Sequence, residues 1–160
     1  MARPLCWEAC LDPQILIVED NPADIVLLKH AFESTGVLWD CRVERDGQAA
    51  MDYLSEAMQS RTLPAYVLLD LKLPSHSGLE VLAWMRTLND LKDIRVIVFT
   101  SSSADEDQVN AERFGIDAYV SKPADLHGYR QTVRRLAELW GLRSTAFHVN
   151  SFLPKLATQL

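Results

Sequence analysis

The sequence predicts an α/β protein with a doubly wound parallel sheet of five strands and helices on both faces. Five apolar runs of strand length alternate along the chain with five segments of helical periodicity. The central runs, residues 15–18, 67–69 and 94–99, are apolar at nearly every position, which is typical of strands covered on both sides. The length of 160 residues allows one domain of this kind.

Each of the first two predicted strands is followed by a helix. Residues 15–18 are fully apolar, and Asp20-Asn21-Pro22 after them suits a helix start, because side-chain oxygens cap free N–H groups and Pro fits the first turn. The second strand, residues 39–44, alternates only partly, so we expect it to be more exposed. The predicted helices run from residue 22 to about 34 and from 49 to about 58.

Three more strand and helix units complete the predicted domain. The strand at 67–69 ends in Asp70, and a loop leads to a helix after Gly78. The strand at 94–99 ends in four hydroxyl residues, and the strand at 118–120 is the last. The remaining helices are predicted at 104–114 and 126–140. The helix at 104–114 has a thin apolar stripe and is expected to be less firmly held.

Charge and cysteine content limit the classes of function. A net charge of -6 without a Lys/Arg-rich stripe argues against nucleic acid as a direct partner. The three cysteines, an odd number without regular spacing, fit a reducing cytoplasm better than a disulfide framework. Residues 1–13 read as a leader without a signal-peptide core, and no apolar run reaches the roughly 18 residues of a membrane span. We therefore expect a soluble cytoplasmic protein.

Polar residues follow four of the predicted strands at the point where each strand ends. They are Glu19, Asp20, Asp70, Thr100 and Lys122. The carboxyl ends of parallel strands meet at one edge of a sheet, so the three acids should lie together and need a cation, for which Mg²⁺ is the suitable hard ion. A Lys ammonium and a Thr hydroxyl beside them could hold a dianion on Asp70, and carboxylates are known nucleophiles in phosphoryl transfer.

This ordered set resembles the signature of the response-regulator receiver domain. Thirty residues separate Asp70 from Thr100 and 22 separate Thr100 from Lys122, as in chemotaxis-type receivers. Pro74 and Gly78 are placed as in the loop that follows the phosphoryl-accepting Asp in that family. The resemblance covers about residues 14–140, which we take as the receiver domain.

The resemblance implies a flavodoxin-like sheet of order 2-1-3-4-5, a Mg²⁺-dependent phosphoaspartate and a sensor histidine kinase as partner. Asp70 would accept the phosphoryl group from a phosphohistidine. The implied Mg²⁺ ligands are the side chains of Glu19, Asp20 and Asp70 and the main-chain carbonyl of Lys72. The implied phosphate-binding residues are Thr100, Ser101 and Lys122. The chain would then be a single-domain two-component response regulator and no enzyme, catalysing only its own phosphorylation from small donors and its own dephosphorylation.

Further roles follow from the same resemblance. Thr100 and Tyr119 would switch the face made by the fourth helix, fifth strand and fifth helix, which would control protein partners or dimerisation. Tyr119 could instead be an ordinary amphipathic residue at a sheet edge. Pro123 is a candidate for a cis peptide bond that aims Lys122 into the site. Lys72 and Ser102 would tune the dephosphorylation lifetime, although Lys72 could equally be a solvated loop residue.

The segments 63–74 and 136–140 are similar to those of stand-alone regulators paired with bacterial phytochrome-type kinases. The C-terminal extension, residues 141–160, holds no recognised output motif but is too apolar for a plain linker. We expect it to pack on the domain or across a homodimer.

Other functions remain as alternatives. An aspartyl-phosphate hydrolase of the haloacid dehalogenase type would carry a second Asp two residues after the nucleophile, where this chain has Lys72. A nucleotide-binding domain would need a glycine-rich phosphate loop, and no such loop follows any strand. A receiver used only for docking would not need this complete set of residues. A phosphorelay intermediate or a phosphate sink would share the same chemistry.

Overall fold

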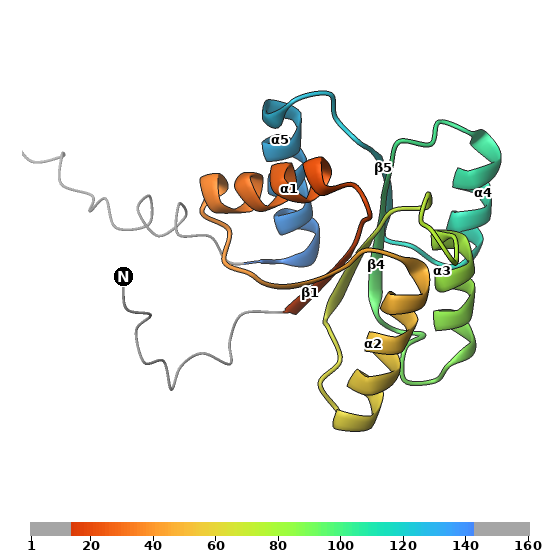
Figure 1. Cartoon of the computed structure of the whole chain (residues 1–160). Coiled ribbons are helices and arrows are strands. Elements are labelled where there is room, and N and C mark those ends of the chain that lie inside the picture. Colours follow the sequence, from red (N-terminus) through yellow and green to blue (C-terminus); the bar gives the residue numbers. More distant parts are fainter. Residues whose placement is uncertain (1–13, 143–160) are drawn as a thin grey trace, which may run out of the picture. The chain divides into compact units, whose positions relative to one another are not determined.

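The computed structural model describes residues 14–142, in which five strands alternate with five helices (Figure 1). The strands are β1 (Gln14–Val18), β2 (Asp40–Glu44), β3 (Tyr66–Leu69), β4 (Arg95–Thr100) and β5 (Ala118–Ser121). The helices are α1 (Pro22–Thr35), α2 (Gly47–Ser60), α3 (Gly78–Thr87), α4 (Asp105–Arg113) and α5 (Leu126–Trp140). The predicted leader and residues 143–160 of the extension lie outside the described residues.

The five strands form one parallel sheet in the order β2-β1-β3-β4-β5. This confirms the predicted class and strand order. Val18 is in register with Leu69, and Leu69 with Val98, so β1 and β3 stop at neighbouring positions and β4 continues to Thr100. Thr100 at the end of β4 likewise faces Ser121 at the end of β5. The residues that follow the strands therefore emerge side by side at the carboxyl edge of the sheet.

The chain divides into two compact units. One unit contains the sheet with α2, α3 and α4 and includes residues 39–122. The other contains most of α1 together with α5, where Tyr129 Oη donates a hydrogen bond to Asp24 Oδ1 at 2.8 Å. Arg130 Nε donates a second bond between these helices, to Ser34 Oγ at 2.9 Å. None of the described helices is long and apolar enough to cross a membrane.

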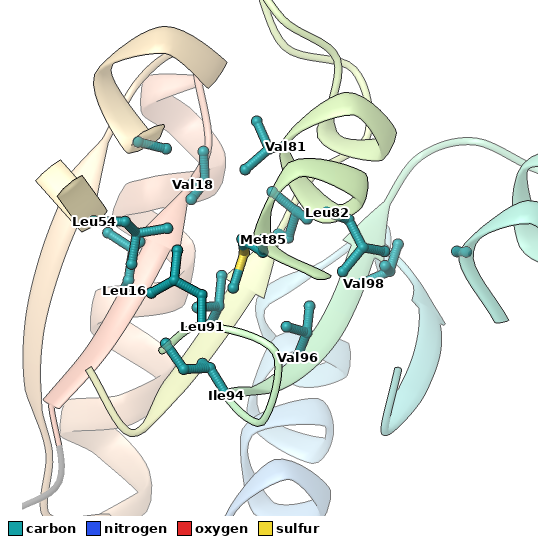
Figure 2. Packing of buried hydrophobic residues seen from close by; sticks show 14 of the residues in the cluster. Leu16, Val18, Leu54, Val81, Leu82, Met85, Leu91, Ile94, Val96 and Val98 are labelled. Atoms are coloured by element: carbon teal, nitrogen blue, oxygen red, sulfur yellow. The ribbon is translucent and has the colours of Figure 1, made fainter. Parts of the chain in front are cut away.

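In the first unit, a hydrophobic core lies between the sheet and its three helices (Figure 2). Alternate residues of β1, β3 and β4 belong to this core together with Leu54 of α2, Leu82 and Met85 of α3, and Ala111 of α4. The strand residues in this layer are Leu16, Val18, Val67, Leu69, Val96 and Val98. Each fully buried aliphatic side chain stabilises the fold by about 1.5–3 kcal/mol. The strand ends, and the polar residues that follow them, are therefore fixed by packing.

The helices of this unit begin with different kinds of cap. Asp46 caps α2 by accepting a hydrogen bond from the Ala49 N–H at 2.7 Å, so α2 starts two residues before the predicted position. Ser77 and Glu80 form a capping box at the start of α3, each side chain accepting from the other's backbone N–H. The capping box of α3 fixes where the loop between β3 and α3 ends.

Helix α4 is held differently. Its N-cap residue, Ala104, makes no side-chain cap bond, and Ala111 is its only buried residue, in agreement with the thin apolar stripe in the sequence. At the far end, the Arg86 guanidinium donates to the carbonyls of Phe114 at 2.7 Å and Gly115 at 3.3 Å. The carboxyl end of α4 is thus tied to α3 by a charged hydrogen-bond donor.

Candidate functional site

Asp70 is the central residue of the site. It follows β3 directly, its N–H donates to the Val18 carbonyl at 3.0 Å, and only 3% of its surface is exposed. Its Oδ1 accepts the Lys72 N–H at 3.1 Å, while the Lys72 side chain is exposed. Its Oδ2 accepts a bond from Lys122 Nζ at 2.6 Å. Both carboxylate oxygens are therefore oriented by hydrogen bonds.

Lys122 brings a positive charge between two buried acids. The residue follows β5, and its N–H donates to the Thr100 carbonyl at 2.9 Å. Its Nζ lies 2.5 Å from Glu19 Oε2 as well as 2.6 Å from Asp70 Oδ2, and the Lys side chain is only 9% exposed. The geometry is that of a shared, charge-assisted pair of hydrogen bonds.

Glu19, Asp20 and Asp70 form a carboxylate cluster. One oxygen from each can be chosen so that all three lie within 4.8 Å of one another. Glu19 and Asp70 are buried, whereas Asp20 is exposed and opens the cluster to solvent. Three acids against one lysine leave an excess of negative charge, and three oxygen ligands leave coordination positions for water and phosphoryl oxygens. The donor set therefore fits Mg²⁺, which is bound in this way in many phosphoryl-transfer sites.

Burial raises the pKa of Glu19 to about 7, although hydrogen bonds from Lys122 and the Asn21 N–H lower it, and the charge of Asp70 raises it further. A carboxylate that takes up a proton near neutrality cannot bind a metal ion in its protonated form. A cation bound at this cluster would therefore compete with that proton.

Thr100 and Tyr119 lie on a chain of hydrogen bonds through Ser102. Thr100 is fully buried, and its Oγ1 accepts the Ser102 N–H at 3.2 Å. Ser102 Oγ donates to Asp107 Oδ2 at 2.5 Å, and the Ser102 carbonyl accepts from Tyr119 Oη at 3.2 Å. Burial raises the pKa of Tyr119, so the phenol is a neutral donor. Ser101 is exposed beside them at the end of β4.

The expectation of a cis bond before Pro123 is wrong. Among the described residues no peptide bond is cis, so the bond from Lys122 to Pro123 is trans. The trans isomer of such bonds is favoured by about 0.5–1 kcal/mol, and nothing here has to overcome that preference. The Lys122 ammonium reaches both Glu19 and Asp70 with the trans backbone.

The structure thus brings four predicted residues into direct contact or a common cluster: Glu19, Asp20, Asp70 and Lys122. Thr100 adjoins them through the Lys122 backbone. The sequence interpretation missed Asp107, whose only signal was its place in an acidic helix start. It also gave no role to Gly47, although this glycine lies against the loop that follows Asp70.

Comparison with known families decides what this arrangement of residues is. The model of the response regulator receiver domain matches residues 15–134. The chain belongs to this family. Membership places the protein in two-component signalling and confirms the flavodoxin-like receiver fold.

Similar proteins span several biological roles. The probable methanogenesis regulatory protein FilR2 of Methanothrix harundinacea is 39% identical over 127 residues, which cover 79% of this chain and 82% of that protein. Response regulator Rcp1 of Synechocystis is 32% identical over 79% of this chain and 87% of its own length. The Mn²⁺-bound structure of Rcp1 matches with a TM-score of 0.72 over 80% of this chain and 94% of that chain.

The phosphorylated form of RcpA, a cyanobacterial phytochrome response regulator, matches with a TM-score of 0.75 at 34% identity. The match covers 83% of this chain and 99% of RcpA. The receiver is therefore related to phytochrome response regulators as well as to a probable methanogenesis regulatory protein.

Proposed function

We propose that this receiver takes a phosphoryl group onto Asp70 from the phosphohistidine of a sensor histidine kinase. One observation carries the proposal. Asp70 is buried, shares a carboxylate cluster with Glu19 and Asp20, and contacts the Lys122 ammonium, which also bonds to Glu19. A carboxylate in this position adjoins both a candidate cation site and a fixed positive charge, as a phosphoryl acceptor requires.

In the proposed reaction, an Asp70 carboxylate oxygen attacks the phosphorus of the phosphohistidine. An O–P bond forms, the P–N bond breaks, and the imidazole nitrogen keeps the electron pair and takes a proton. Lys122 would pair with one phosphoryl oxygen, and the Thr100 hydroxyl and Ser101 would donate to others. Positioning and charge neutralisation supply most of the catalysis in such transfers.

We propose Mg²⁺ as the cation, held by the carboxylates of Glu19, Asp20 and Asp70 and by the Lys72 carbonyl. When bound, the ion neutralises charge on the transferring phosphoryl group. The hydrogen bond from the Lys72 N–H to Asp70 Oδ1 supports the proposed role of the Lys72 carbonyl, because it places the Lys72 backbone beside the cluster. The exposed Lys72 side chain and buried Ser102 are proposed to tune the lifetime of the phosphoryl group, which Lys72→Asn would then change.

The proposed readout starts at Thr100. If its hydroxyl turns toward the phosphoryl group, the Ser102 N–H loses its acceptor, and the bonds from Ser102 to Asp107 and Tyr119 carry the change to α4 and β5. Protein partners or a second copy of the chain would respond to this surface. RcpA is a phytochrome response regulator, so a phytochrome-type kinase is the first class of partner to test.

The test of this function uses the full chain with acetyl phosphate and Mg²⁺. We expect intact-mass analysis to show addition of one phosphoryl group, lost in Asp70→Asn and on chelation of Mg²⁺. Asp90→Asn, which alters an exposed acid remote in sequence from the cluster, is the matched control and should still be labelled. Equal labelling of the Asp70→Asn protein would disprove the assignment of the acceptor.

Dimerisation is tested separately by light scattering with and without beryllofluoride, a stable phosphoryl mimic. We expect the molecular mass in solution to increase when the mimic and Mg²⁺ are present. A monomer under both conditions would remove the proposed homodimer and leave only the control of other protein partners.

A further inference from the structure

The loop between β3 and α3, residues 70–77, is held by the first residues of two helices. Gly78, the first residue of α3, donates its N–H to the Leu71 carbonyl at 2.9 Å. A Cβ built at Gly78 would overlap the Asp70 carbonyl oxygen and lie 2.7 Å from the Leu71 Cα. The start of the loop, at Asp70 and Leu71, therefore packs directly against the backbone of Gly78.

The other contact comes from a distant part of the sequence. Gly47, the first residue of α2, donates its N–H to the Pro74 carbonyl at 3.2 Å. A Cβ at Gly47 would overlap the His76 carbonyl oxygen and lie 2.7 Å from His76 Cβ. Next to it, His76 Nε2 donates to Gln48 Oε1 at 3.2 Å. The first turn of α2 thus contacts the middle of the loop in three ways.

The loop itself contains a strained residue. Ser75 has a φ of 65° although it is not glycine. A non-glycine residue in this region costs on the order of 1 kcal/mol and persists only where surrounding contacts determine the backbone. Gly47 supplies such constraints, because it contacts Pro74 and His76, the residues on either side of Ser75.

We propose that the first turn of α2, Gly47 with Gln48, positions the loop that presents the Lys72 backbone to the cation site. This inference rests on the proposed binding of Mg²⁺ at Asp70. The Lys72 N–H fixes Asp70 Oδ1 at 3.1 Å, so a displacement of the loop moves both a carboxylate oxygen and the proposed carbonyl ligand. Gly47 would act through the loop and would touch neither the ion nor the phosphoryl group.

The test compares Gly47→Ala with Gly115→Ala in the full chain. Gly115 has a φ of 68° and nothing within 4 Å of a built Cβ, so its replacement strains the backbone without touching the loop. We expect Gly47→Ala to weaken Mg²⁺ binding, measured by calorimetric titration, by tenfold or more. In metal-free protein, the Lys72 amide resonance should shift and its hydrogen exchange should accelerate. Gly115→Ala should lower stability but leave the Lys72 amide and the Mg²⁺ affinity unchanged.

A milder pair of variants covers the case in which Gly47→Ala does not fold. Gln48→Ala removes the exposed bond to His76 and a second exposed bond, from Gln48 Nε2 to Asp52 Oδ1 within α2. Gln108→Ala removes the matching exposed bond to Glu112 within α4 and so controls for the loss of the second bond. We expect Gln48→Ala to shift the Lys72 amide and weaken Mg²⁺ binding two- to threefold, with no effect of Gln108→Ala.

The outcomes separate this inference from the proposed function. Wild-type protein that fails to bind Mg²⁺ would refute the proposed cation site, whereas the shift of the metal-free Lys72 amide would still support the positioning role. Wild-type protein that binds Mg²⁺, together with Gly47→Ala and Gln48→Ala proteins that behave as their controls do, would overturn the role of α2.

Discussion

Lys122 is the residue on which the charge balance of the site depends. Its single ammonium bonds to both Glu19 and Asp70, and each of the three side chains is at most 9% exposed. Removal of one partner from a buried ion pair leaves charge without compensation, which costs about 3–5 kcal/mol. The lysine is therefore expected to support the fold of the metal-free protein as well as the proposed phosphoryl transfer.

Replacement of Lys122 by methionine keeps an unbranched side chain of similar length and removes its charge. At pH 8 without divalent ions, we expect Lys122→Met to lower the free energy of unfolding by about 3 kcal/mol, measured by urea denaturation. Lys72→Met, at an exposed lysine, should change it by less than about 0.5 kcal/mol. Equal stabilities of the two variants would show that Lys122 is not needed to offset the acids.

Glu19 links stability to pH. Its pKa is raised from 4.5 to about 7, chiefly by burial, so the folded protein holds a proton that the unfolded chain has lost between these values. The sign follows: the contribution is complete below pH 4.5 and is lost as pH rises through 7.

Between pH 5.5 and pH 8, we expect Glu19 in metal-free protein to reduce the free energy of unfolding by about 2 kcal/mol. Glu19→Gln, which cannot titrate, should lack this part of the decrease when both proteins are followed by urea denaturation across the range. The same proton competes with the cation, so the Mg²⁺ affinity of the wild type should fall as pH drops below 7. Parallel pH profiles of the two proteins would contradict the raised pKa.

At the scale of elements, α4 depends on polar ties at both ends. Asp107 bonds to Ser102 Oγ near its start, and Arg86 bonds to the Phe114 and Gly115 carbonyls after its end. With Ala111 as its one buried residue, the helix gains little from packing. Loss of either tie should therefore loosen the helix more than a similar change in a well-packed element.

We expect Asp107→Ala to accelerate hydrogen exchange of the α4 amides about five- to tenfold, which corresponds to about 1–1.4 kcal/mol. Asp105→Ala is the control, since it removes an exposed acid from the same first turn and has the same effect on the helix dipole. Native-state exchange followed by NMR would measure both. If the two variants exchanged alike, the bond between Ser102 and Asp107 would have no special role in holding α4.

The sequence predicts features that depend on local pattern, but not features that depend on packing between elements far apart in the chain. Apolar runs locate strand ends, and parallel strands end at one edge, so the meeting of Glu19, Asp70, Thr100 and Lys122 could be predicted from pattern alone. The strand order could not, because periodicity does not say which strands pair, and it came from the family resemblance. The contact of Gly47 with His76 also depends on packing between elements 29 residues apart in the chain.

The Pro123 error has a different physical origin. The two isomers of a bond before proline differ by only about 0.5–1 kcal/mol, so local sequence contains little information about the choice. The choice is made by the surroundings, and here the trans backbone already places Lys122 against both acids.

For the whole molecule, cation binding at one site should stabilise the folded state. Above the dissociation constant, each tenfold increase in Mg²⁺ should add about 1.4 kcal/mol to the free energy of unfolding if one ion binds. Asp20→Asn, which removes the exposed carboxylate of the cluster, should reduce this slope strongly at moderate concentrations, whereas Asp90→Asn should keep it. Thermal unfolding across a Mg²⁺ series measures the slope, and an unchanged slope in Asp20→Asn would exclude Asp20 as a ligand.

The lysine bridge across Glu19 and Asp70 has one more consequence, for the life history of the protein. A newly synthesised chain already contains the Lys122 ammonium as a counter-ion for these two acids. We therefore expect it to fold and to escape degradation when free Mg²⁺ is scarce. The Mg²⁺ concentration would then govern how readily the folded protein is phosphorylated, and not how much folded protein accumulates.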